Sequence, residues 1–135
     1  MVTTRRSEPS PALDALAHEV IDAALEVHRW LGPGYLESCY EEALAIELRE
    51  RQIAFRRQAP ISVDYKGRVV GEGRADFIVG DGLLVELKTV EALAPMHKAQ
   101  VLSYLKATRG ILGLLINFNV PVLRDGIRRV VRSSP

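Results

Sequence analysis

The chain has 135 residues, of which 47% are hydrophobic and 26% charged, and its formal net charge is +1. This length suits one domain with a sizeable core, and the composition is that of an ordinary globular protein. No apolar run reaches the length of a transmembrane helix, so we expect no membrane-spanning segment. The near-zero charge neither indicates nor excludes a nucleic-acid partner.

Residues 1–11 carry charges but no apolar run, so they lack the features of a secretory signal and we expect a disordered tail there. We expect residues 12–135 to form a single domain. Cys39 is the only cysteine, which excludes an internal disulfide and a zinc site made of several cysteines. We expect Cys39 to be buried as a small apolar residue. The absence of a signal and of disulfides favours a cytoplasmic location.

Helices come first along the chain. Apolar residues recur at helical spacing from Leu13 to Leu31, which predicts an amphipathic helix. Gly32-Pro33-Gly34 ends this helix. A second helix is predicted from about Tyr35 to Arg51.

Strands and one more helix follow. Strands are predicted at residues 61–65, 68–79 and 83–90, with turns at 66–67 and 80–82. A third helix runs from Pro95 to about Arg109, a buried strand covers 111–118, and a last edge strand covers 126–132. This order predicts an α+β (α/β) fold in which helices pack on a mixed central sheet.

The hairpin formed by the second and third predicted strands is the most informative segment. If its loop is residues 80–82, Phe77 lies opposite Val85 on a wholly apolar face. Because side chains alternate along a strand, the other face then carries Asp76 directly opposite Glu86. One face of this hairpin is therefore expected to be core, and the other to carry a compact charged cluster flanked by Ile78 opposite Leu84.

The charged face suggests a metal site. Two opposed carboxylates repel, and a hard divalent cation such as Mg²⁺ between Asp76 and Glu86 removes that penalty. Lys88 lies two residues after Glu86 on the same face, opposite Arg74, where it can orient an attacking water. The pattern favours metal-assisted hydrolysis of a phosphodiester. The alternative is a solvated surface on which Arg74 and Lys88 neutralise the two acids.

The flanking helices carry polar residues that could converge on this charged face. Gln100 and Tyr104 are four residues apart in the third helix, and His97 lies on the same side. Glu37 and Glu41 have the same spacing in the second helix, and the spacing leaves either as the site residue. Arginine and lysine residues also gather in two stretches, 51–74 and 124–132, which are either solvated faces or phosphate contacts.

Taken together, these features resemble the PD-(D/E)XK nuclease superfamily. The matching parts, in order, are Glu37, Asp76, Glu86-Leu87-Lys88 and Gln100-Val-Leu-Ser-Tyr104. The segment from Gly34 to Tyr40 also matches the signature of the GxxExxY protein family, and the resemblance extends from about Val20 to Phe118. It implies a restriction-endonuclease-like αβββαβ core with an additional N-terminal helix.

The resemblance also implies a role for each matching residue. Asp76, Glu86 and the Leu87 carbonyl would bind Mg²⁺ or Mn²⁺, and Glu37 would bind the metal or order water on it. Lys88 would position the nucleophilic water.

Four further residues complete the predicted site. Gln100 would orient the active-site face, and we expect Tyr104, Arg74 and His97 to contact the substrate. The predicted function is a metal-dependent nuclease acting on DNA or RNA. The alternative is a non-catalytic nucleic-acid-binding or protein-interaction module on the same scaffold, as a homodimer.

Overall fold

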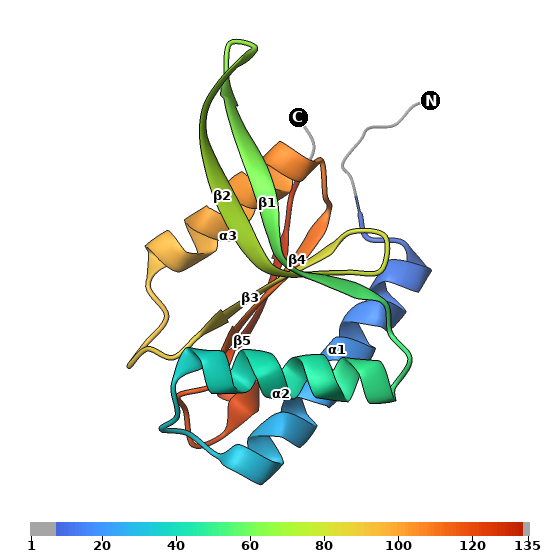
Figure 1. The fold of residues 1–135 in the computed structure, drawn as a ribbon, viewed down its shortest axis with the longest axis vertical. Helices are drawn as coiled ribbons and strands as arrows, with labels where there is room; N and C mark the ends of the chain where they lie inside the picture. Colours follow the sequence, from blue (N-terminus) through green and yellow to red (C-terminus); the bar gives the residue numbers. More distant parts are fainter. Residues whose placement is uncertain (1–7, 134–135) are drawn as a thin grey trace.

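A computed structural model describes residues 8–133 of the chain. Figure 1 shows its elements, and the predicted order of helices and strands is confirmed. They are α1 (Pro11–Leu31), α2 (Glu37–Glu50), β1 (Phe55–Tyr65), β2 (Arg68–Val79), β3 (Leu83–Lys88), α3 (Pro95–Thr108), β4 (Leu112–Asn117), the 3₁₀ helix η1 (Leu123–Gly126) and β5 (Ile127–Val131).

The start of α1 lies inside the tail expected over residues 1–11. Residues 1–7 of that tail lie outside the described part of the chain, but α1 begins at Pro11. The Ser10 hydroxyl accepts a hydrogen bond from the backbone N–H of Leu13 at 3.1 Å. Ser10 thereby satisfies an N–H that a helix start leaves unpaired, and Pro11 loses no hydrogen bond at the first helical position.

The five strands form one mixed sheet in the order β1-β2-β3-β4-β5. Neighbouring strands are antiparallel except β3 and β4, which are parallel and joined by the crossover helix α3. β1 begins at Phe55, six residues before the predicted start at Ile61. The prediction missed this part of β1 because Arg56-Arg57-Gln58 interrupts the apolar pattern.

Helices cover both faces of the sheet. α1 and α2 pack on one face, over an apolar cluster that includes Phe77, Val85 and Leu87. On the other face, Val101 and Leu105 of α3 pack in a second cluster with Ile78 and Leu84. The expected pairs Phe77–Val85 and Ile78–Leu84 are both present, and the second pair, which flanks the acids on the other face, is buried under α3.

The outer part of the β1–β2 hairpin projects beyond the rest of the sheet (Figure 1). β3 pairs with β2 only over Phe77–Val79, so the greater part of β2 has β1 as its only neighbouring strand in the described chain. None of the described helices combines the length and the apolar character that crossing a membrane requires.

Gly126 provides a test of how tightly the loop after β4 is packed. A Cβ atom at this buried position would lie 2.3 Å from the backbone oxygen of Asn117, which cannot move away cheaply. We predict that Gly126→Ala lowers the free energy of unfolding by about 2–3 kcal/mol in urea titrations. Gly71→Ala is the matched control, since a Cβ atom there meets nothing within 4 Å. Equal stability of the two variants would contradict the prediction.

Candidate functional site

Asp76 and Glu86 join β2 to β3 through their side chains at the point where the strands separate. The regular ladder ends at the pair Phe77–Val85. Beyond it, Glu86 Oε1 accepts the backbone N–H of Asp76 at 2.9 Å, and Asp76 Oδ2 accepts the backbone N–H of Leu87 at 2.8 Å. We call these two hydrogen bonds the Asp76–Glu86 bridge. It holds the two carboxylates close together, although the predicted pairing of Asp76 with Glu86 in the strand ladder is wrong because the ladder ends at Phe77.

The bridge keeps these acids in an unfavourable environment for charge. Glu86 is only 5% exposed. Burial, and then the negative charge of Asp76, raises the pKa of the Glu86 carboxyl to about 7, although the Asp76 N–H and the positive charge of Lys88 work against this shift. Burial also raises the pKa of Asp76, despite its hydrogen bond from Leu87. A nearby cation would therefore favour the ionised form of both carboxyl groups.

Glu37 and Lys88 belong to the same electrostatic cluster. Glu37 is the first residue of α2, and burial followed by the charge of Asp76 raises the pKa of its carboxyl. Lys88 ends β3 and opposes the raised pKa of Glu37, Asp76 and Glu86. Within residues 8–133, Lys88 forms no ion pair. The structure thus brings together the three acids and the lysine predicted from the sequence.

Tyr40 holds the loop that leads to Glu37. Its buried hydroxyl donates to the Gly32 carbonyl at 2.5 Å and accepts the N–H of Tyr35 at 3.2 Å. Its ring stacks on Phe118 with centroids 4.6 Å apart, and the backbone N–H of Phe118 donates to the Lys88 carbonyl at 2.9 Å. Tyr40 therefore links the start of α2 to the end of β3, where Glu37 and Lys88 lie.

Asn117 fixes the chain just beyond Lys88 in a way that sequence reasoning missed. It is 1% exposed and lies beside Lys88 in the parallel β3–β4 register. Its side-chain amide donates to the Val90 carbonyl at 2.9 Å and accepts the Val90 N–H at 3.1 Å. The Asn117 side chain thus makes the two hydrogen bonds that a neighbouring strand would otherwise make with the backbone of Val90. A polar residue at the end of an otherwise apolar strand was the signal that could have identified it.

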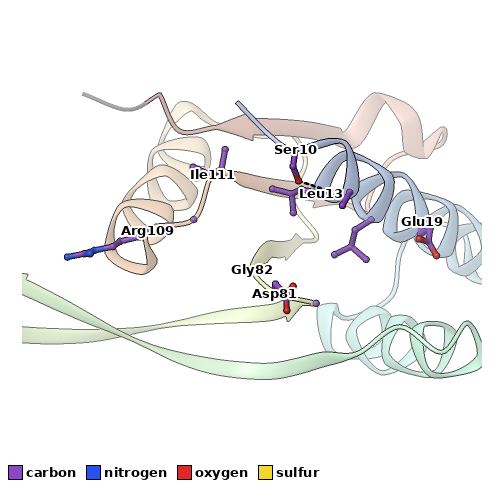
Figure 2. A pocket seen from close by; sticks show the side chains of 11 residues that line it. Ser10, Leu13, Glu19, Asp81, Gly82, Arg109 and Ile111 are labelled. Atoms are coloured by element: carbon purple, nitrogen blue, oxygen red, sulfur yellow. Dashed lines mark hydrogen bonds between the residues drawn. The ribbon is translucent and has the colours of Figure 1, made fainter. Parts of the chain in front are cut away.

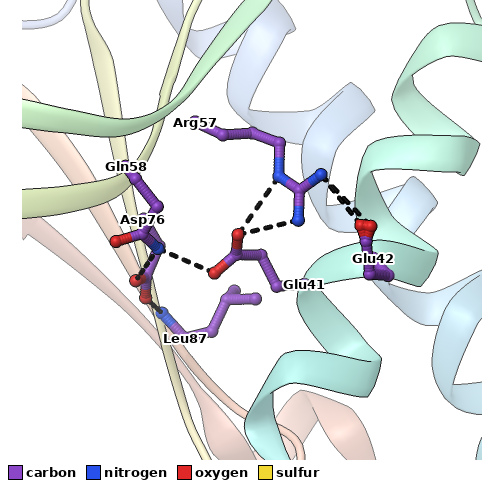
Figure 3. Close-up of polar contacts among 6 residues, drawn as sticks. All are labelled: Glu41, Glu42, Arg57, Gln58, Asp76 and Leu87. Atoms are coloured by element: carbon purple, nitrogen blue, oxygen red, sulfur yellow. Dashed lines mark hydrogen bonds and ion pairs between the residues drawn. The ribbon is translucent and has the colours of Figure 1, made fainter.

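Glu41 lies at the centre of a second polar group, shown in Figure 3. Its Oε2 accepts two N–H groups of Arg57, at 2.8 and 3.1 Å, and its Oε1 accepts the Gln58 amide at 2.8 Å. The same Gln58 amide donates to Asp76 Oδ1 at 3.3 Å, and Arg57 also pairs with Glu42. Glu41, the alternative to Glu37 in the sequence, is thereby connected to the Asp76–Glu86 bridge through Gln58.

The remaining predicted site residues lie around the cluster without contacting its acids. Arg74 is exposed and is opposite Pro60 of β1, so its expected pairing with Lys88 is wrong. The reason is that β2 and β3 separate at the bridge. Tyr104 lies over Gly73 of β2. Gln100 is exposed in α3 and has no hydrogen bond to a described side chain.

His97 caps the start of α3, since its Nδ1 accepts the backbone N–H of Ala94 at 2.9 Å. Cys39 is exposed, in contrast to the buried position expected for it. It follows Glu37 by two residues in the first turn of α2, at a position that faces away from the core. The sequence pattern did not reveal this because small residues occur on both faces of a helix.

The two predicted basic stretches are partly neutralised. Arg57 pairs with Glu41 and Glu42, and Arg51 pairs with Glu47. Near the C-terminus, Arg129 pairs with Asp14 at 2.8 Å, and Arg132 donates to the Gly110 carbonyl. Arg57, Arg129 and Arg132 thereby connect elements that lie far apart in the sequence.

A cavity of about 520 Å³ lies away from the acid cluster, at the opposite end of β3 (Figure 2). It is lined by the 80–82 turn, the first half of α1 and the segment after α3. None of the described residues that line it is a predicted site residue. The acids of the candidate site therefore do not lie in this cavity.

The raised pKa of Glu86 predicts a pH-dependent effect on stability. Because the folded state holds this proton up to about pH 7 and the unfolded state only to about pH 4.5, the folded chain loses stability as the pH rises between these values. Glu86→Gln keeps the acceptor oxygen but cannot ionise. We predict that it raises the free energy of unfolding by about 2–3 kcal/mol at pH 8 and changes it little at pH 4. A pH-independent difference in denaturant titrations would contradict this.

Replacing Asn117 tests its hold on the chain after Lys88. Asn117→Ala leaves the N–H and the carbonyl of Val90 without their partner, so we predict a loss of about 2–3 kcal/mol in unfolding free energy. Hydrogen exchange at the Val90 amide should accelerate. Asn119→Ala is the control, because only the backbone of Asn119 contacts Asn117. Unchanged exchange at Val90 in Asn117→Ala would show that the amide does not hold this segment.

Comparison with known proteins places this arrangement in a family. The model of the PD-(D/E)XK nuclease superfamily matches residues 14–130, which include every residue of the candidate site. No curated protein matches the chain. The mixed five-stranded sheet and the three α-helices, of which α1 is the additional N-terminal helix, are consistent with a restriction-endonuclease-like α+β fold. The chain therefore belongs to the PD-(D/E)XK nuclease superfamily.

Proposed function

We propose that this protein is a metal-dependent nuclease that hydrolyses phosphodiester bonds of DNA or RNA. The observation that carries the proposal is the Asp76–Glu86 bridge with Lys88 beside it. Two partly or fully buried carboxylates held together at raised pKa are costly to the fold, and an approaching cation offsets that cost. A purely structural ion pair with Lys88 would not require two such acids held side by side.

The donor groups suit a hard divalent cation such as Mg²⁺ or Mn²⁺, which generally binds one or two carboxylates and completes its shell with water and substrate phosphate. Asp76 and Glu86 would hold it, with the Leu87 carbonyl as a backbone ligand. Residues 8–133 contain no group of three His, Cys, Asp or Glu side chains that could hold a metal ion. The protein would therefore supply only these two carboxylates and the backbone carbonyl, and water and substrate phosphate would complete the shell. When bound, the metal would supply Lewis-acid stabilisation of phosphate charge and a more acidic water.

The residues around the metal position would act on the water and the phosphate. Lys88 Nζ would donate a hydrogen bond to the attacking water and balance the phosphate charge. Glu37, whose pKa is raised by burial, would order a neighbouring water at its carboxylate. Gln58 and Glu41 would keep Asp76 in orientation through the Gln58 amide. The chemistry is thus divided between the end of β3 and the start of α2.

Other predicted residues would contact the substrate outside the reacting phosphate. Arg74 is exposed two residues before Asp76, where its guanidinium would reach a neighbouring phosphate. Tyr104, Gln100 and His97 lie on α3, and we retain them as substrate-contacting or orienting residues. His97 would keep its capping contact with Ala94 in this role.

The loop between α1 and α2 supports membership of the GxxExxY branch, which we propose. Gly34 has a φ of +108°, a conformation that glycine adopts readily. Tyr40 fixes this loop, and Glu37 begins the helix that follows. The three signature residues thus have one joint structural consequence, which is the position of the Glu37 carboxylate.

Two broader assignments complete the proposal. We propose that residues 12–135 act as one domain in the cytoplasm, consistent with a lone, free cysteine.

A non-catalytic interaction module on the same scaffold, acting as a homodimer, is the second candidate. The exposed apolar side chains of the β1–β2 hairpin favour it.

Nuclease assays with matched variants test the proposal. We predict that the wild-type protein cleaves plasmid or single-stranded substrates with Mg²⁺ or Mn²⁺, and that Asp76→Asn and Lys88→Ala each lower the rate at least about 100-fold. Asp81→Asn and Lys98→Ala are controls, because both residues are exposed and outside the acid cluster. Chelator should abolish cleavage by the wild type.

The outcomes separate the two candidates. Equal activity of the wild type and both site variants would identify a contaminating nuclease. Folded, inactive wild-type protein that binds nucleic acid in chelator would favour the non-catalytic module. Calorimetric Mn²⁺ binding that Glu86→Gln weakens would support the metal site independently of turnover.

A further inference from the structure

The outer part of the β1–β2 hairpin carries a cluster of exposed apolar side chains. Every residue from 62 to 72 is exposed, and we call this segment the hairpin arm. Val63, Tyr65, Val69 and Val70 lie in it and are 40–69% exposed. Four of the eleven exposed large hydrophobic residues of the described chain thus fall within eleven consecutive positions. Single exposed apolar residues are ordinary, but a cluster of them indicates an interaction surface.

The register places apolar side chains on both faces of the arm. Val63 and Tyr65 alternate with Ile61 along β1 and continue the face that packs under α3 nearer the sheet. Val69 pairs with Asp64 and lies on the opposite face, and Val70 has no partner because the register shifts there. Burying only one face of the arm would therefore leave apolar side chains of the other face in water.

Nothing else in residues 8–133 supports the arm. Packing from α3 ends near Gly73, where Tyr104 lies against the backbone. β3 leaves β2 at the Asp76–Glu86 bridge, so both edges of the arm lack a further strand. An isolated two-stranded ribbon is marginally stable in water, and an unpaired strand edge is a template for pairing with another chain.

The charges of the arm argue against nucleic acid as the molecule that covers it. Lys66 and Arg68 are balanced by Asp64 and Glu72, so residues 62–72 carry no net charge. Phosphate binding depends on an excess of cations. The arm's charges are instead distributed in a self-complementary way, because Asp64, Lys66 and Arg68 make the tip net positive and Glu72 makes the part nearer the base negative. Two arms lying antiparallel would set the tip of each against the base of the other.

We propose that the hairpin arm is a dimer interface and that its partner is a second copy of this chain. A two-fold interface uses the same patch on both copies, so a self-complementary patch is what it requires. The proposal goes beyond the nuclease assignment and does not depend on cleavage.

Sedimentation of the full chain tests this interface. We expect the wild type to form a dimer between about 1 and 100 µM, and Tyr65→Glu/Val70→Glu to raise the dissociation constant about 100-fold or more. Ile46→Glu/Val122→Glu is the matched control, since it replaces two apolar residues outside the arm that are also more than half exposed. The control should remain dimeric.

A second measurement needs no variant and covers the case in which the arm variant fails to fold. In the wild type, hydrogen exchange at the amides of residues 62–72 should slow as the protein concentration rises through the dimer range. A monomeric wild type, a dimer that the arm variant leaves intact, or exchange in the arm that is independent of concentration would overturn the proposal. A monomer whose nucleic-acid affinity falls on changing the arm would assign the surface to nucleic acid instead.

Discussion

The rest of the site depends on the exchange of hydrogen bonds between Asp76 and Glu86. In a regular antiparallel pair, backbone groups satisfy each other and the side chains are free. Here each carboxylate takes the place of a backbone acceptor and satisfies an N–H on the neighbouring strand. The strands can therefore separate without leaving these donors unpaired, and the two acids are fixed at the point of separation. The same separation frees the β1–β2 hairpin to project from the sheet.

Contacts on both sides of the sheet make this arrangement rigid. The stacked rings of Tyr40 and Phe118 connect the loop before Glu37 to the backbone of Lys88. Asn117 then holds the chain beyond Lys88, and the Gln58 amide holds Asp76 from the side of β1. Of these groups, Tyr40 and Asn117 are buried, and buried polar groups specify a single geometry when their hydrogen bonds are satisfied. The site is thus supported by elements that lie far apart in the sequence, namely α2, β1 and the end of β4 with Phe118.

Periodicity and turn residues predicted most of the fold. The 80–82 turn and the alternation around it predicted the pairs Phe77–Val85 and Val79–Leu83, which the structure contains. The grouping of Glu37, Asp76, Glu86 and Lys88 also followed from motif and register. These features depend on short-range rules, namely the two-residue strand period and the residue preferences of tight turns.

The features that the sequence did not predict depend on contacts between distant elements. The start of β1 was hidden because Arg57 is polar in sequence but paired with Glu41 and Glu42 in space. Arg74 could not be separated from Lys88 without knowing that the ladder ends at Phe77. Asn117 was overlooked since its partners lie 27 residues away. In each case the structural role of a polar side chain depends on a distant part of the chain, which a local sequence pattern does not identify.

The three acids of the cluster share one physical property, which connects the stability of the fold to the chemistry proposed for it. Burial raises the pKa of Glu37, Asp76 and Glu86 alike, so ionising them opposes folding rather than supporting it. A fold can retain such groups only if the apolar clusters on both sheet faces provide the compensating stability. Function is expected at sites where residues such as buried acids lower the stability of the fold. The acids that weaken this fold when charged are therefore the groups best placed to bind a cation.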